Sequence, residues 1–341
     1  MINTIYRLVS PKLFEEVYSE VDDLENEVVV RPTHLSICQA DQRYYNGSRD
    51  PETLAEKLPM ALIHEGIGEV IKDNTGTFNS GDLVVIIPNT PIEEDEIIAE
   101  NYLRSSKFRA SGFDGFMQDY IISKPDRLVK LPDNINMNVA SFIELVSVSV
   151  HAISRFSKVS HKKKNTIGVW GDGNLGYITS LLLKIFFPES EIVVFGKSDE
   201  KLNMFSFVDE TFKINEAPNN LKIDHAFECV GGRGSGLAIN QIIDIIHPEG
   251  TIGLLGVSEY DVLINTRMVL EKGLYIFGTS RSGRKDFIKT VSIFKEDSKL
   301  VSYLENIVNH VIHIRTIDDI NEAFKKDFNS NFGKTVLIWD K

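Results

Sequence analysis

The segment that decides the fold is Thr166-Ile-Gly-Val-Trp-Gly171-Asp-Gly173-Asn-Leu-Gly176, a short apolar run that ends in G-x-G-x-x-G. An apolar pattern at helical spacing follows over residues 175–187. The first glycine permits a tight turn, the second lets a pyrophosphate approach the backbone, and the third lets helix pack on strand. A pyrophosphate would then meet the N–H groups at the start of the helix. The sequence therefore predicts a dinucleotide site whose contacts are Gly171, Gly173, Asn174, Leu175 and Gly176.

On both sides of this segment the pattern changes along the chain. Residues 148–285 alternate strands, at 166–170, 191–195, 225–229, 251–255 and 274–277, with helices, at 175–187, 199–207 and 237–246. This alternation is typical of a doubly wound parallel sheet, so the chain is assigned to the α/β class. Residues 1–147 carry short strands closed by proline and glycine, which predict a β-rich, barrel-like domain. The tail, 286–341, ends in a strand at 334–339 and is expected to return to that first domain.

The tip of the second parallel strand bears on the choice of cofactor. An acid at this place would bind the ribose 2′-hydroxyl of NAD, but here Gly196, Lys197 and Ser198 follow the strand. With no carboxylate predicted at the tip and a cation beside it, the sequence favours NADP(H), with these three residues among its contacts. NAD(H) remains the alternative.

Composition excludes several classes of function. The 37 Lys and Arg against 49 Asp and Glu give a net charge of −12, which argues against binding nucleic acid or an anionic membrane through a basic face. The two cysteines, Cys38 and Cys229, cannot form a disulfide framework. The N-terminal residues lack the apolar core of a signal peptide. We therefore expect a cytoplasmic protein that binds neither nucleic acid nor membrane.

The β-rich part contains a second set of chemically active side chains. Cys38, His64-Glu65 and Glu144 are scattered in sequence, and each alone would be ordinary: a lone cysteine is commonly buried filler. Together they offer sulfur, imidazole and carboxylate ligands, a set that suits a catalytic zinc with one open position.

The order Cys38, His64-Glu65-Gly66, Glu144 and then the glycine fingerprint resembles the zinc-dependent medium-chain dehydrogenase/reductase family, and its polyol dehydrogenase branch in particular. The resemblance implies a GroES-like catalytic domain (1–147 and 286–341) and a Rossmann NADP-binding domain (148–285). It implies zinc ligation by Cys38, His64 and Glu144. Glu65 would bind the zinc directly or through water, and Asp41 would orient the ligating histidine. Glu65 and Asp41 are thus the predicted catalytic residues.

The sequence also departs from that family. Residues 89–112 contain none of the four cysteines of the family's structural zinc lobe, so one zinc per chain is expected. Ala40 stands where the family often has a serine that relays protons, which points to a proton route through Glu65.

Within the branch, the missing lobe, the polyol-type ligands and the NADP preference imply reduction of D-ribulose 5-phosphate to D-ribitol 5-phosphate with NADPH, for teichoic-acid or capsular polymer precursors. Arg281, Arg43 and Tyr44 are the predicted substrate contacts. A homodimer and a functional pairing with a ribitol-5-phosphate cytidylyltransferase are further expectations. Two alternatives stay open: another polyol or threonine-type NAD(P)-dependent dehydrogenase, and a zinc-free nucleotide-binding sensor built on the same fold.

Overall fold

The computed structural model describes residues 1–21, 24–330 and 332–341 of the chain. They form two compact units: unit 1 comprises Met1–Ser147 and Ser282–Lys341, and unit 2 comprises Val148–Arg281. Helix α4 (Ile143–Val159) runs from one unit into the other. Among the described residues, no helix is both long and apolar enough to cross a membrane.

Residues 282–285, which the sequence pattern placed in the nucleotide-binding domain, belong to unit 1. The reason is a set of polar contacts made by Arg284. Its backbone N–H donates to Glu100 Oε1 at 2.6 Å, and its guanidinium donates to the carbonyl of Leu128 at 2.9 Å. Both partners lie in unit 1.

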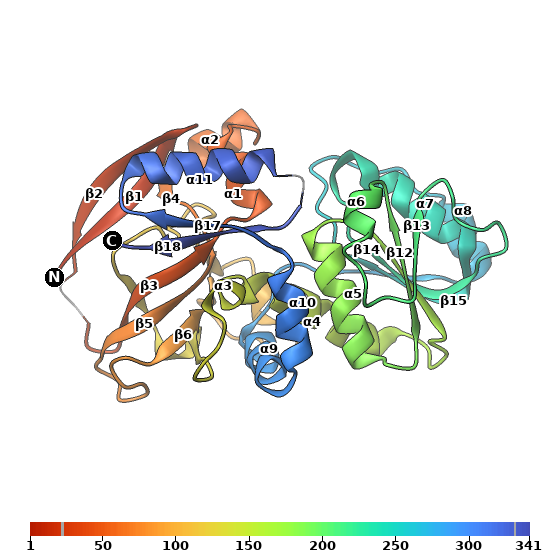
Figure 1. Cartoon of the computed structure of the whole chain (residues 1–341), viewed down its shortest axis with the longest axis horizontal. Helices are drawn as coiled ribbons and strands as arrows, with labels where there is room; N and C mark the ends of the chain where they lie inside the picture. Colours follow the sequence, from red (N-terminus) through yellow and green to blue (C-terminus); the bar gives the residue numbers. More distant parts are fainter. Residues whose placement is uncertain (22–23, 331) are drawn as a thin grey trace. The chain divides into compact units, whose positions relative to one another are not determined.

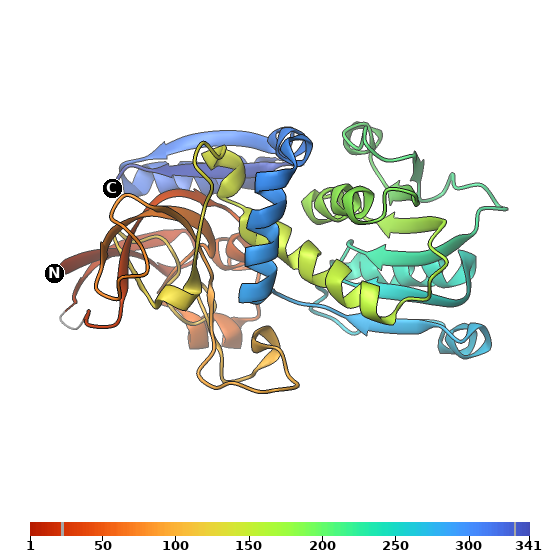
Figure 2. The ribbon, with the colours of Figure 1, turned by 90° about the horizontal axis from the view of Figure 1, so that it is seen from below.

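Unit 1 is built from short strands and peripheral helices (Figures 1 and 2). Its elements are β1 (Ile2–Ser10), β2 (Leu13–Glu20), β3 (Val28–Ser36), α1 (Gln39–Tyr45), α2 (Pro51–Lys57), β4 (Met60–Ala61), β5 (Glu65–Asp73), β6 (Leu83–Ile86), β7 (Asn89–Thr90), η1 (Glu100–Tyr102), β8 (Lys107–Phe108), β9 (Ile121–Ser123), η2 (Pro125–Arg127), β10 (Leu128–Lys130), α3 (Met137–Ala140), α9 (Arg284–Glu296), α10 (Ser298–Glu305), β17 (Val308–Ile314), α11 (Ile317–Asn329) and β18 (Lys334–Trp339).

The main sheet of unit 1 has the strand order β10-β6-β5-β3-β18-β17, with β9 also paired to β3. The C-terminal strand β18 thus inserts between β3 and β17, and the tail belongs to unit 1 together with residues 1–147. Helix α11 contacts β17 and β18 (Figure 1). The pairing sets Ser36 of β3 opposite both Glu65 of β5 and Val336 of β18. Three segments far apart in sequence therefore meet at the end of β3.

Unit 2 is a six-stranded, wholly parallel sheet with helices on both faces (Figures 1 and 2). Its elements are β11 (Thr166–Trp170), α5 (Asn174–Phe186), β12 (Glu191–Gly196), α6 (Asp199–Leu202), β13 (Glu210–Lys213), β14 (Ile223–Glu228), η3 (Gly232–Gly234), α7 (Ser235–Ile245), β15 (Ile246–Leu254), α8 (Thr266–Lys272) and β16 (Tyr275–Gly278). In the order β13-β12-β11-β14-β15-β16, strands β12 and β13 are added on one side of β11 and strands β14, β15 and β16 on its other side, so the switch point lies between β11 and β14. Dinucleotides bind at the carboxyl ends of the strands beside such a switch point.

One predicted helix of unit 2 is shorter than its pattern indicates. The sequence predicts a helix over 199–207, but α6 ends at Leu202. Beyond it, Phe205 and Phe207 pack edge-on against the ring of Tyr177 in α5, with ring centroids 5.2 and 4.9 Å away. Docking of these two rings on α5 takes the place of a further helical turn.

Candidate active site

The first cluster of the site is assembled by Asp41, which lies in the first turn of α1. Its Oδ2 accepts a hydrogen bond from the backbone N–H of Cys38 at 3.1 Å, and its Oδ1 accepts one from the N–H of Ile63 at 2.9 Å. Cys38 caps α1 just beyond β3, and Ile63 precedes β5. One buried carboxylate thus fixes two segments that carry predicted zinc ligands.

These contacts bring Cys38, His64 and Glu65 together. The sulfur of Cys38, one ring nitrogen of His64 and one carboxylate oxygen of Glu65 all lie within 4.8 Å of one another. The His64 and Glu65 side chains are buried. Next to them, Ile63 has a φ of 69°, a left-handed conformation that is rare for a β-branched residue and marks local strain at functional sites.

Asp41 stands beside the ring of His64, as the resemblance implies for an orienting residue. Its Oδ1 lies 3.7 Å from His64 Nδ1, which is within ion-pair range but beyond a hydrogen bond. Burial alone would lower the pKa of His64, but the neighbouring side chains of Asp41 and Cys38 together outweigh this effect and raise the pKa well above its usual range.

Glu65 has a partner that the sequence analysis did not identify. The ammonium of Lys334, at the start of β18, lies 2.8 Å from Glu65 Oε2 and also donates to the carbonyl of Ile37 at 2.7 Å. Both side chains are almost completely buried. Burial raises the pKa of the Glu65 carboxyl, and the charge of Lys334 opposes that rise.

Glu144 lies near this cluster, but it is not one of the three residues whose ligand atoms lie within 4.8 Å of one another. It is buried in the first turn of α4. Burial raises its pKa to about 7; the charge of His64 opposes the rise and that of Glu65 adds to it. Its ligation of a metal therefore stays a prediction.

The donor set fits a zinc ion. Burial also raises the pKa of the Cys38 thiol, and the neighbouring carboxylate of Glu65 adds to the rise, so the anionic forms of both groups are disfavoured in the absence of a further cation. Among the residues that the structure describes, His64 Nδ1 and Glu65 Oε1 have no hydrogen-bond partner. A divalent cation would stabilise the thiolate and carboxylate forms that burial disfavours, and sulfur, imidazole and carboxylate are ligands that zinc accepts.

The glycine fingerprint in unit 2 has the geometry that its sequence predicts. Gly171 has a φ of 127°, and a Cβ on Gly176 would overlap the carbonyl oxygen of Gly171, so turn and close packing both require glycine. A Cβ on Gly173 would meet nothing within 4 Å. Gly173 therefore faces open space at the start of α5, where a pyrophosphate has room.

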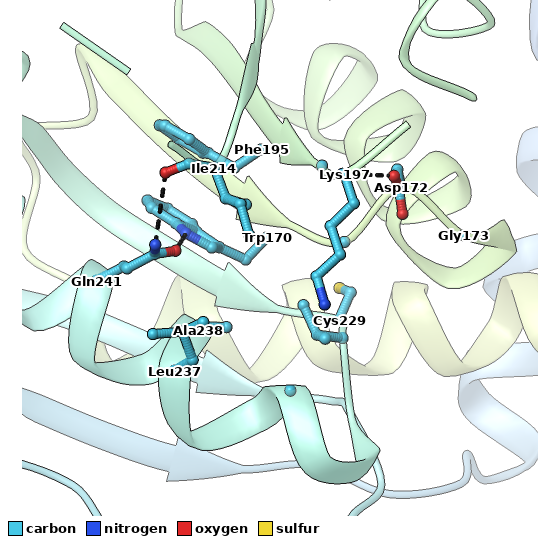
Figure 3. Close-up of a pocket in the computed structure, with 14 residues that line it drawn as sticks. Trp170, Asp172, Gly173, Phe195, Lys197, Ile214, Cys229, Leu237, Ala238 and Gln241 are labelled. Atoms are coloured by element: carbon cyan, nitrogen blue, oxygen red, sulfur yellow. Dashed lines mark hydrogen bonds between the residues drawn. The ribbon is translucent and has the colours of Figure 1, made fainter. Parts of the chain in front are cut away.

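A cavity of about 210 Å³ opens beside this turn (Figure 3). Its floor includes Trp170, whose ring stacks on Phe195 at 3.9 Å and whose indole N–H donates to Gln241. Gly196, Lys197 and Cys229 also line it. Strand tip and fingerprint thus share one cavity, at the carboxyl ends of the strands where dinucleotides bind in such sheets.

The tip of β12 differs from its sequence prediction in one respect. A carboxylate is present there, supplied by Asp172 of the fingerprint rather than by β12 itself. Its Oδ2 accepts hydrogen bonds from the N–H groups of Lys197 at 2.7 Å and Ser198 at 2.9 Å. The expectation of a tip without an acid was wrong because a neighbouring turn provides the acid. Ser198 uses its hydroxyl to cap α6.

The predicted substrate contacts are dispersed over the two units. Arg281 ends unit 2 with a φ of 59° and is partly buried. Arg43 is half-buried in α1 of unit 1. Tyr44 is only 2% exposed, belongs to the core of unit 1 and is covered by the guanidinium of Arg49, 4.7 Å from its ring centroid. This burial favours a packing role for Tyr44.

The lobe of residues 89–112, which has no cysteine, is held by an ion pair. Buried Arg127 reaches both oxygens of Glu100, at 3.0 and 3.3 Å, and the carbonyl of Asn89 at 3.2 Å. Glu100 also accepts the backbone N–H of Arg284. A bidentate ion pair thus connects the lobe to η2, and the backbone N–H of Arg284 connects it to the start of α9.

Comparison with known proteins agrees with this architecture. Residues 24–133 match the alcohol dehydrogenase GroES-like domain family. The chain is 58% identical over 340 residues to ribulose-5-phosphate reductase of Bacillus spizizenii, covering 100% of both chains. It is 57% identical to ribulose-5-phosphate reductase 1 of Staphylococcus aureus, covering 99% of both. The crystal structure of S. aureus TarJ in complex with NADPH superimposes with a TM-score of 0.90 at 52% identity, covering 100% of both. The chain therefore belongs to the medium-chain dehydrogenase/reductase family, in the group that these ribulose-5-phosphate reductases form.

Proposed function

We propose that this chain reduces D-ribulose 5-phosphate to D-ribitol 5-phosphate with NADPH. The observation that carries the proposal is the 58% identity, over the whole length of both chains, to a ribulose-5-phosphate reductase. Two features of the chain support it: the zinc-compatible cluster of Cys38, His64 and Glu65, and the nucleotide cavity lined by Lys197.

In this proposal Cys38, His64 and Glu65 hold the zinc, with Glu144 as a further ligand. When bound, the ion supplies Lewis-acid polarisation of the substrate carbonyl. Asp41 fixes the ligand segments, and Lys334 holds Glu65 through the 2.8 Å ion pair. Because Ala40 has no hydroxyl, the proton for the new alcohol is proposed to pass through Glu65 where that carboxyl meets the zinc through water, since its Oε1 has no hydrogen-bond partner among the described residues and its Oε2 is paired with Lys334.

The substrate phosphate needs local cations on a chain of net charge −12. Arg281 and Arg43 are the proposed phosphate contacts, and Tyr44 would support Arg43 from the core. The reaction would supply ribitol 5-phosphate to a cytidylyltransferase for teichoic-acid or capsular polymer precursors. We place the protein in the cytoplasm, since NADPH and an activated-sugar pathway belong to that compartment. We also propose that it is a homodimer, as the family resemblance implies.

The test is turnover of purified protein, followed by NADPH absorbance. D-ribulose 5-phosphate should be reduced at least tenfold more efficiently, in kcat/KM, than unphosphorylated ribulose or xylulose. Better turnover of a free ketose, or NAD-dependent oxidation of threonine, would favour one of the alternative dehydrogenases. NADPH binding without turnover of any of these compounds would favour the sensor.

A further inference from the structure

Asp172 occupies a place that the fingerprint alone does not explain. It is the first variable residue of G-x-G-x-x-G, yet its carboxylate reaches the next strand over and bonds the turn after β12 (Figure 3). One oxygen, Oδ2, accepts both the Lys197 and the Ser198 N–H groups. These are the two residues that follow the strand whose tip conventionally reads the ribose 2′ position.

Close packing fixes the carboxylate there. A Cβ on Gly196 would lie 2.6 Å from Asp172 Cβ and 2.8 Å from its Oδ2. Asp172 can therefore occupy this position only because residue 196 is a glycine. The absence of a side chain at Gly196 thus has a steric cause, in addition to any effect on the choice between NADPH and NADH.

Few other contacts hold this turn. Helix α6 begins at Asp199 and has only four residues, and the Ser198 hydroxyl is engaged in capping it at 3.4 Å. The Gly196 carbonyl accepts the N–H of Ile214 at 3.0 Å. Charge-assisted bonds to a carboxylate are roughly twice as strong as neutral ones. The two bonds to Asp172 are thus the main anchor of residues 197–198.

The side chain that this anchor presents is Lys197. Its ammonium extends along the cavity in Figure 3, and no ion pair or hydrogen bond of that ammonium occurs with the part of the chain that the structure describes. Asp199, at the same tip, is already paired, because its carboxylate lies 2.6 Å from the ammonium of Lys213.

We propose that Asp172 is a positioning residue for cofactor selectivity: by holding both turn amides, it sets the backbone from which Lys197 reaches the 2′-phosphate of NADPH. This rests on the proposed use of NADPH. The negative charge of Asp172 does not itself favour NADPH, because a carboxylate repels a nearby phosphate. Asp172 favours NADPH through its oxygen, which accepts the hydrogen bonds that position the turn.

Two substitutions separate the acceptor from the charge. Asp172→Asn keeps one carbonyl oxygen, which can accept both N–H groups as Oδ2 does now, and loses the charge. Asp172→Ala loses the acceptor. Asp199→Asn is the matched control, since it removes a carboxylate at the same tip that makes no bond to the turn amides.

The assay is binding in the absence of sugar, with adenosine 2′,5′-bisphosphate and adenosine 5′-monophosphate as probes that differ only in the 2′-phosphate, followed by NADPH and NADH. For Asp172→Ala we expect Kd for the bisphosphate to rise tenfold or more and Kd for the monophosphate to change less than threefold. Asp172→Asn should keep or improve the wild-type ratio, and Asp199→Asn should leave it within threefold. Amide hydrogen exchange at residues 197 and 198 should accelerate in the alanine variant only.

Tighter binding of the bisphosphate by Asp172→Ala would overturn the proposal, because it would make Asp172 a competitor of the phosphate for the two amides. Equal losses in the asparagine and alanine variants would also overturn it. If the alanine variant does not fold, Asp172→Ser removes the same long acceptor. A wild-type protein that does not distinguish the two probes would refute both this inference and NADPH use, whereas normal discrimination without turnover of ribulose 5-phosphate would refute the proposed substrate alone.

Discussion

Lys334→Met should destabilise unit 1 strongly. The ammonium lies 2.8 Å from Glu65 Oε2, the two side chains are 3% and 0% exposed, and the substitution leaves a buried carboxylate without its counter-charge. Removing one partner of a buried ion pair typically costs about 3–5 kcal/mol. Methionine matches the length of the lysine stem, so little of this loss should come from a cavity. Glu65→Gln combined with Lys334→Met removes both charges and should recover more than half of the loss.

The measurement is urea unfolding of chelator-dialysed protein, in which zinc cannot replace the missing cation. The chain has two tryptophans, Trp339 in unit 1 and Trp170 in unit 2. In a Trp170→Phe background the fluorescence of Trp339 therefore reports unit 1 alone. Lys130→Met is the control, because Lys130 is 52% exposed and pairs with Asp82 at the surface, where an ion pair contributes about 1 kcal/mol or less. The reasoning fails if Lys334→Met costs no more than this control, or if the double variant is as unstable as the single one.

Three further outcomes are expected. Cys38→Ser should lower zinc content from one ion per chain to a small fraction and abolish turnover while the far-ultraviolet circular dichroism stays unchanged; two zinc ions per wild-type chain, by metal analysis, would contradict this. Arg281→Ala should raise KM for ribulose 5-phosphate roughly ten- to hundredfold, since a charge-assisted hydrogen bond contributes about 1.5–3 kcal/mol; an unchanged KM would remove Arg281 from the phosphate site. Gly196→Asp should weaken NADPH and NADH alike, because the new Cβ would lie 2.6 Å from that of Asp172; a clean switch to NADH in kcat/KM would show that the turn can rearrange.

The parts of the fold that follow from local constraints could be predicted from sequence. The glycine fingerprint works this way: Gly171 and Gly176 are fixed by a turn and a close approach that tolerate no side chain, and the parallel sheet follows from its strand–helix alternation. The hairpin β1–β2 escaped prediction because β2 carries two adjacent acidic residues, Glu15 and Glu16, where a half-buried strand would alternate apolar and polar residues.

The site was predictable only where residue type restricts chemistry. Cys38, His64 and Glu65 are ordinary one by one, but as a set they are residue types that bind metal ions, and this made the cluster recognisable. Lys334 does not, because a lysine that opens an apolar strand is ordinarily exposed, and its partner Glu65 is 269 positions earlier. Asp172 escaped notice because the fingerprint leaves its position free. Lys334 and Asp172 each contact a segment that is separate in sequence, and only the fold brings the contacting residues together.

The bidentate ion pair of Arg127 and Glu100 determines how the lobe responds to metal shortage and to oxidation. A lobe closed by four thiolates and a metal loosens whenever the metal is scarce or the thiols are oxidised. Here the same stretch of chain is closed by a guanidinium and a carboxylate, neither of which is oxidised or chelated. Zinc starvation would therefore silence the chemistry of this chain while leaving the lobe folded, and resupply of a single ion would restore activity without refolding.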